Sequence, residues 1–155
     1  MTIDDTRIAD RLALRALVEA YAHGVDRREF VSVAKLFTHD GKLSSYSGQP
    51  IGQPPIYERI GHDQIERAMQ GLLKYDITSH ALSQQTILFD PADPDKASAE
   101  TYCCAQHLYS DNGRWNRVMS IRYLDHYKRL DNVWLISDRC LATDWVEVRP
   151  ALEPT

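Results

Sequence analysis

Four long segments in the second half of the sequence are rich in Thr, Tyr, Val, Ile and Trp, the residue types that favour β-strands. They cover residues 78–89, 97–110, 114–129 and 133–147, and the turn-forming sequences DPADPD, SDNG and LDN separate them. Strands that are joined by turns this short pair with each other as antiparallel hairpins. The second half of the chain therefore predicts an antiparallel sheet.

The first half of the sequence has the apolar spacing of helices. Apolar residues at four-residue steps over residues 8–21 predict an amphipathic helix with one face in a core. The stripe consists of Ile8, Ala9, Leu12, Ala13, Ala16, Leu17, Ala20 and Tyr21. Gly24 is expected to end this helix, because glycine adopts the left-handed conformation of a helix C-terminus at little cost.

Two further helices are predicted before the strands. Asp26, with Glu29 three residues later, resembles a capping box at the start of a second helix that runs through Phe37. A third helix is expected over residues 63–74, whereas the glycines and prolines of residues 38–61 predict turns with short extended pieces. Helices followed by hairpins indicate an α+β fold, whose curled sheet can enclose a pocket.

Composition limits the class of protein. The chain has 155 residues, enough for a single domain, which we expect over residues 1–148 with a short tail over 149–155. Its net charge of −4 argues against nucleic acid or an anionic membrane surface as the main partner. No segment has the roughly 20 apolar residues of a membrane span, and the acidic start MTIDDTRIAD lacks the features of a secretion signal. Three cysteines without a C-x-x-C motif favour a reducing, cytoplasmic location.

Tyr21 and Asp26 each have a structural and a functional interpretation. Tyr21 is either a core tyrosine with a backbone partner, or a proton donor or substrate anchor at the bottom of a cavity. Asp26 is either a helix cap or a carboxylate that orients a histidine, and the two roles are compatible. His80, on the first predicted strand, is the histidine that it could orient, but a single strand histidine gains a catalytic role only beside a carboxylate and a pocket.

Three other polar residues lie on small or apolar strand faces. His107, Tyr123 and Arg139 are candidates for ligand contacts, although packing explains Tyr123 equally well. His80, His107 and His126 could together supply zinc ligands, but the sequence has no H-x-H or H-x₃-H pair among them, so we predict no metal site. The motifs of phosphate loops, dinucleotide-binding folds and nucleophile elbows do not occur either.

Three segments resemble a known family. The opening DRLALRALVEAYAHGVDRREFVSVAKLFTHDGKL, the strand TSHALSQQTI and the closing HYKRLDNVWLISD are similar to the SnoaL-like branch of the nuclear transport factor 2-like superfamily. The resemblance covers residues 7–145 and implies a cone in which three N-terminal helices pack on a curved, mixed but mostly antiparallel sheet that encloses a pocket. The fold alone does not imply one activity, because dehydratases, isomerases, cyclases and non-enzymes share it.

Within this group, the pattern is most similar to the bile-acid 7α-dehydratases and scytalone dehydratase. The resemblance implies a catalytic set of Tyr21, Asp26 and His80, with His107 as a second histidine. It also places Tyr46 near a pocket tyrosine and Arg139 near a substrate-binding arginine, and Tyr123 is kept as a further ligand contact.

The resemblance implies a cofactor-independent elimination on a hydrophobic ring compound such as a steroid, polyketide or aromatic intermediate. In this mechanism His80, oriented by Asp26, removes a proton next to a carbonyl that tyrosine hydroxyls polarise. An isomerase or cyclase with the same proton transfers, and a ligand-binding module without catalysis, remain alternatives.

The expected partners are a small-molecule substrate and further copies of the chain. Trp145 and Val146 lie beyond the core-facing part of the last predicted strand, and an exposed apolar end of this kind is often a subunit contact. Relatives of the resembled group are usually dimers or trimers. We therefore expect a homo-oligomer.

Overall fold

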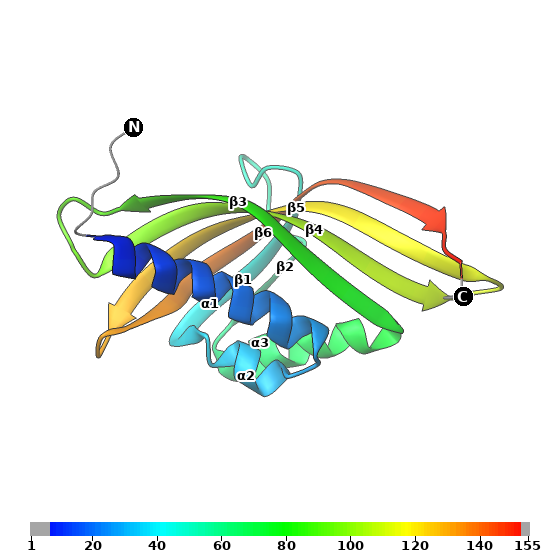
Figure 1. Ribbon diagram of the computed structural model, residues 1–155, viewed down its shortest axis with the longest axis horizontal. Coiled ribbons are helices and arrows are strands. Elements are labelled where there is room, and N and C mark those ends of the chain that lie inside the picture. Colours follow the sequence, from blue (N-terminus) through cyan, green and yellow to red (C-terminus); the bar gives the residue numbers. More distant parts are fainter. Residues whose placement is uncertain (1–6, 153–155) are drawn as a thin grey trace.

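The computed structural model describes residues 7–152, so that the expectations for the first six residues and for the end of the tail lie outside the described part. In the described part of the chain, two helices come first, two strands and two further helices follow, and four long strands come last (Figure 1). The helices are α1 (Ile8–Asp26), α2 (Phe30–Ala34), α3 (His62–Met69) and the 3₁₀ helix η2 (Gln70–Lys74). The strands are β1 (Phe37–Ser47), β2 (Tyr57–Ile60), β3 (Ile77–Phe89), β4 (Lys96–Ser110), β5 (Arg114–Leu130) and β6 (Val133–Pro150). The expected α+β class is confirmed.

The six strands form one sheet in the order β2-β1-β6-β5-β4-β3. All neighbours are antiparallel except β1 and β6, which pair in parallel, so the sheet is mixed but mostly antiparallel as expected. Its pairing register shifts at several points, including Leu82/Gln85 between β3 and β4 and Ser120/Ile121 between β5 and β6. Such irregularities bend strands and increase their twist, and here the sheet curves with the helices on one face (Figure 1).

Helix α1 buries a different face from the one that its alanine spacing predicts. The buried residues are Leu14, Leu17, Val18, Tyr21, Ala22, Gly24 and Val25, whereas Ile8 and Leu12 are exposed. Of the predicted stripe only Leu17 and Tyr21 are buried. The prediction was wrong because alanines fit either side of a helix, and the larger Leu14 and Val18 release more free energy when they are buried.

The end of α1 corrects two further expectations. Gly24 does not stop the helix but lies inside it, and a Cβ atom there would come within 2.7 Å of Val33 Cγ2, so the glycine permits the close approach of α2. The helix ends two residues later in a Schellman motif, in which the N–H groups of Glu29 and Arg28 donate to the carbonyls of Gly24 and Val25. Arg28 supplies the left-handed residue, with a φ angle of 63°.

Asp26 is therefore the last residue of α1 and not the cap of the second helix. The short helix α2 starts at Phe30, and no side chain caps its first residue. Phe37, which was expected in that helix, begins β1 instead, and β1 is longer than the short extended piece that was expected there. The third helix was predicted well, although its last turns are the 3₁₀ helix η2.

The strand boundaries of the second half were predicted to within a few residues. β6 continues through Arg149 and Pro150, which pair with Asn116 and Trp115 of β5, so the expected tail starts two residues too early. The core lies between the concave face of the sheet and α1, and its fully buried side chains include Leu14, Tyr123 and Ile136. No helix within residues 7–152 is long and apolar enough to span a membrane.

Candidate functional site

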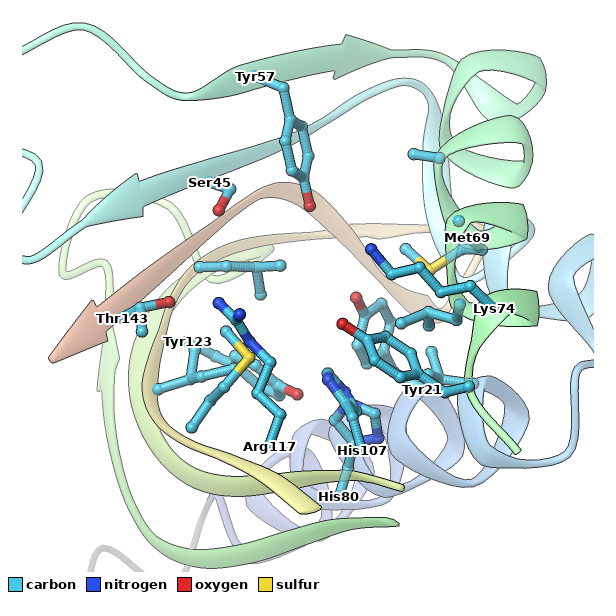
Figure 2. Close-up of a pocket in the computed structure, with 18 residues that line it drawn as sticks. Tyr21, Ser45, Tyr57, Met69, Lys74, His80, His107, Arg117, Tyr123 and Thr143 are labelled. Atoms are coloured by element: carbon cyan, nitrogen blue, oxygen red, sulfur yellow. The ribbon is translucent and has the colours of Figure 1, made fainter. Parts of the chain in front are cut away.

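A pocket of about 360 Å³ lies between the concave face of the sheet and the helices (Figure 2). Helix α1 contributes Tyr21 and Val25 to its wall, and the pair β1 and β2 contributes Ser45 and Tyr57. Strands β3 to β5 contribute further residues: His80, His107, Arg117, Met119, Ile121 and Tyr123. The lining is thus mostly apolar and aromatic with a few polar groups, the usual composition of a small-molecule site.

Asp26 and His80 form a hydrogen-bonded pair at this wall. The Nδ1 atom of His80 lies 2.6 Å from Oδ1 of Asp26, and the backbone N–H of His80 donates to Oδ2 at 2.9 Å. A carboxylate accepts hydrogen bonds only, so Nδ1 carries the proton in the neutral imidazole, and Nε2 then carries the lone pair. His80 lines the pocket, and within residues 7–152 its Nε2 has no hydrogen-bond partner. The pair has the arrangement of a general base and its orienting carboxylate.

Thr78 and Arg28 hold the carboxylate of Asp26 in place. The Thr78 hydroxyl donates to Oδ1 of Asp26 at 2.9 Å and accepts from Nη1 of Arg28 at 2.6 Å. The Arg28 guanidinium also donates to the backbone carbonyls of Val25 and Tyr75, each at 3.2 Å. The side chain of Arg28 thereby ties the end of α1 to the segment that leads into β3. The left-handed backbone conformation of Arg28 lies in the turn from which this side chain makes its contacts.

These contacts keep Asp26 ionised. Partial burial works against the charged carboxylate, but hydrogen bonds from the side chain and backbone of His80 outweigh it and lower the pKa of Asp26. The hydrogen bond from Thr78 acts in the same direction. An ionised Asp26 stabilises a protonated His80, which is what a base requires after it has taken a proton.

Tyr21 and Tyr123 are buried side by side, with ring centroids 5.8 Å apart. Burial raises the pKa of Tyr21, while the Arg139 guanidinium, 4.1 Å from the ring centroid, acts in the opposite direction. The hydroxyl of Tyr123 donates to Cys103 Sγ at 3.3 Å. Both tyrosines line the pocket, and within the described residues Tyr21 has no hydrogen bond to its hydroxyl.

His107 lies next to His80, with ring centroids 5.5 Å apart, and stacks on Tyr75 at 4.5 Å. Neither of its ring nitrogens has a hydrogen-bond partner within residues 7–152. Burial, with smaller contributions from His80 and Arg117, lowers the pKa of His107 to about 4. His107 is therefore a neutral imidazole at pH 7, able to bind a ligand but not to supply a proton as an imidazolium.

Two expected ligand contacts lie elsewhere. Tyr46 does not line the pocket, because it follows Ser45 on β1 and successive side chains of a strand point to opposite faces. Arg139 is fully buried behind Tyr21 and Tyr123, and its guanidinium donates twice to the carboxylate of Asp125, at 2.8 and 2.7 Å. Arg139 thus supports the tyrosines without lining the pocket. His126 is exposed, and the described residues contain no cluster of three potential metal ligands.

Several lining residues were missed at the sequence level. Tyr57 faces the pocket from β2, opposite the histidines (Figure 2); burial raises the pKa of its hydroxyl, and the side chain of Ser45 acts in the opposite direction. Lys74 and Arg117 lie at the same pocket. Arg117 could have been found by strand alternation, since residues 117, 119, 121 and 123 share a face. Tyr57 and Lys74 had no such signal, because they lie in a short strand and a 3₁₀ turn.

Comparison with solved structures shows a shared fold. A protein from Novosphingobium aromaticivorans provisionally named a scytalone dehydratase aligns with a TM-score of 0.77 and 23% identity, over 96% of this chain and 95% of that one. Hexachlorocyclohexane dehydrochlorinase LinA type 3 from Novosphingobium barchaimii aligns with a TM-score of 0.79 and 17% identity, over 99% of each chain. A comparison with curated proteins finds no match. A family model described as a SnoaL-like domain matches residues 6–140, and the chain belongs to the SnoaL-like domain family, within the nuclear transport factor 2-like superfamily.

Proposed function

We propose that this protein is a cofactor-independent lyase that removes water from a hydrophobic, ring-containing small molecule. The observation that carries the proposal is the 2.6 Å contact between His80 Nδ1 and Asp26 Oδ1 at the wall of an apolar pocket of about 360 Å³. This contact leaves Nε2 of His80 free for a substrate, beside the part of the pocket wall that carries the hydroxyl of Tyr21. A hydrogen-bonded base within a pocket is the minimum that proton abstraction from carbon requires.

In the first step, Nε2 of His80 takes a proton from the carbon next to a substrate carbonyl. The electrons of the broken C–H bond form a C=C bond, and the negative charge moves to the carbonyl oxygen. Tyr21, and Tyr57 from the opposite wall, are the hydroxyl donors that stabilise this charge. Asp26 stabilises the imidazolium that forms on His80.

In the second step, the carbonyl re-forms and the bond to a hydroxyl on the β carbon breaks. The departing oxygen takes the proton from His80 and leaves as water, which returns the base to its starting state. His80 is the better donor for this step, because His107 is neutral at pH 7 and has a pKa of about 4. His107 then serves to bind the departing group or the ring.

The names of the structural neighbours agree with an elimination, since one is a dehydrochlorinase and another is provisionally named a dehydratase. An isomerase or cyclase would use the same two proton transfers without losing water. Mass spectrometry of the product separates these outcomes, because only the dehydratase product is lighter by one water.

The test is a turnover screen of β-hydroxylated cyclic ketones with the parent protein and three variants. His80→Gln and Asp26→Asn should each lower kcat by roughly 10²–10⁴, the usual contribution of general-base catalysis. His126→Gln removes an exposed histidine from the strand β5 and should leave kcat unchanged. Folded His80→Gln and Asp26→Asn variants with parental turnover would refute the proposed mechanism, and a parent that binds such ketones without turning any over would favour a binding module.

We also propose that the protein is a homo-oligomer. Trp145 is 57% exposed and Val146 and Val148 are 41% and 51% exposed, all on the last part of β6. Exposed apolar side chains grouped in this way favour contact with a second copy. Sedimentation that gives a mass near that of the 17.8 kDa chain would contradict this proposal.

A further inference from the structure

Two cationic side chains line the pocket of a protein whose net charge is negative. Arg117 projects from β5, where it pairs directly with His107 on β4, and Lys74 is the last residue of η2. Figure 2 shows their side chains on opposite sides of the cavity, with the two histidines below. Of the described residues that line this pocket, none is an aspartate or a glutamate. The charged side chains Arg117 and Lys74 that line this pocket are thus both cationic.

Within the described residues, neither of these two cations has a carboxylate partner, in contrast to Arg122 and Arg139. Arg122 is paired with Glu100 and Asp144, and Arg139 is paired with Asp125. Within residues 7–152 neither Arg117 nor Lys74 forms an ion pair or a hydrogen bond, and Lys74 has only the ring of Tyr75, 5.1 Å away. Arg117 is half-buried and so loses part of its hydration, and an anionic partner would offset this loss.

A second depression adjoins the pocket at the same cations. It has a volume of about 260 Å³ and is lined by Lys74, Tyr75, Tyr109, Ser110 and Arg117, three of which also line the main pocket. Lys74 and Arg117 thus lie at the boundary between an apolar chamber and an outer groove. A ligand can place a ring against His80 and still bring an anionic substituent to these two side chains.

We propose that the substrate is an anionic ring compound whose carboxylate, or phosphate ester, binds between Arg117 and Lys74. The planar guanidinium of Arg117 matches such an anion with two parallel N–H donors, and the ammonium of Lys74 adds a second charge from the facing helix. The anion binds across from His107 on the neighbouring strand, which places the ring of the ligand beside the Asp26–His80 pair. The inference rests on the proposed function for the site of reaction, but the binding of the anion does not require turnover.

The test is equilibrium binding of naphthoate, naphthyl phosphate and the neutral naphthamide, measured by calorimetry. The three probes share one ring system, so differences in affinity report the charge. We expect at least one of the anions to bind the parent protein about ten-fold tighter than naphthamide, a typical gain for charge-assisted hydrogen bonds. Whichever of the two anions binds tighter identifies the anionic group.

Variants assign that gain to the two cations. Arg117→Gln should weaken binding of the anion by about ten-fold, and Lys74→Gln should weaken it by less, because Lys74 is exposed. The affinity for naphthamide should stay the same in both variants. Lys128→Gln makes the same change in net charge on an exposed position of the strand β5 and should change nothing. Asp26→Asn should bind the anions like the parent protein, so loss of catalysis and loss of anion binding are measured separately.

Three results would overturn the inference. They are anions that bind no tighter than naphthamide, anions that fail to bind in the millimolar range, and an Arg117→Gln variant that keeps the parental preference. None of these results bears on the base role of His80, which the turnover screen tests independently.

Discussion

Replacing Thr78 by valine tests whether the Asp26–His80 pair is held by a network of charged hydrogen bonds. The substitution keeps the shape of a buried side chain and removes its hydroxyl, which accepts from Arg28 at 2.6 Å and donates to Asp26 at 2.9 Å. A hydrogen bond to a charged group contributes about 1.5–3 kcal/mol. The two bonds together set an upper limit on the loss of unfolding free energy. The actual loss is smaller where the charged partners keep other contacts.

Both partners keep other contacts. Arg28 retains two backbone carbonyls, and Asp26 retains both bonds from His80. The Asp26 side chain is also 24% exposed, so water can replace the lost donor. We therefore expect Thr78→Val to lower the free energy of unfolding by about 2 kcal/mol, or the melting temperature by about 4–8 °C for a chain of this size.

Urea unfolding measures this loss, with Thr101→Val as a matched control. Thr101 is fully buried, and the hydrogen bond that its hydroxyl accepts comes from the neutral amide of Gln85. Its loss should cost about 1 kcal/mol. A cost of Thr78→Val that is no greater than that of Thr101→Val would refute the view that Thr78 is held between charged groups.

The pH dependence gives a second readout. The pKa of Asp26 is lower in the folded protein, so the stability that its hydrogen bonds provide is present above the unfolded pKa and is lost as the pH falls through the folded pKa. Valine at position 78 removes one of these bonds. The difference in stability between the parent protein and Thr78→Val should therefore shrink at acidic pH, and a constant difference would contradict the role of an ionised Asp26.

Three further substitutions test packing and charge. Gly24→Ala should destabilise by about 1–2 kcal/mol, because the clash with Val33 exceeds the gain in helix propensity, and the cost should be smaller in a Val33→Ala background. Burial lowers the pKa of His107 from 6.5 to about 4, so the contribution of this residue to stability is full above pH 6.5 and falls toward pH 4. His107→Phe should therefore reduce the difference in unfolding free energy between pH 7 and pH 5 by about 1–2 kcal/mol. Arg139→Met leaves Asp125 buried without its partner and should cost about 3–5 kcal/mol, and adding Asp125→Asn should restore part of that loss. These assignments would be contradicted by an equal cost of Gly24→Ala with and without Val33→Ala, or of Arg139→Met with and without Asp125→Asn. An unchanged pH dependence of stability in His107→Phe would contradict the role given to His107.

Much of the fold could be predicted because its signals are local. Each of the four long strands contains enough β-favouring residues, and each connecting turn enough Asp, Asn, Pro or Gly, to mark its own boundaries. The parallel pairing of β1 with β6 could not be derived in this way, because it joins segments almost a hundred residues apart and depends on how the sheet closes. The resemblance to the family supplied that part of the architecture.

The pocket lining was predicted where strand alternation applies and missed where it does not. Tyr123 was found, and the same alternation leads to Arg117. Arg139 was placed on a suitable strand, but its distance from the pocket depends on Asp125, a partner that the sequence pattern does not reveal. Tyr46 lies one residue after the pocket-lining Ser45 on β1, and a shift of one residue along a strand reverses the direction of a side chain.

Asp26 shows why a local pattern could not decide between a cap and a functional carboxylate. The sequence around it satisfies the composition of a capping box, and such a box would have used its oxygens on the backbone of the next helix. In the structure those oxygens instead bind Thr78 and His80, which are 52 and 54 residues away in the chain. This choice requires α1 to continue through Asp26 and then turn sharply at Arg28, in a left-handed conformation that is unfavourable for arginine. The cost is offset because the same turn directs the Arg28 guanidinium to Thr78 and to two backbone carbonyls, so the contact that stabilises the unusual turn also fixes the carboxylate beside the histidine.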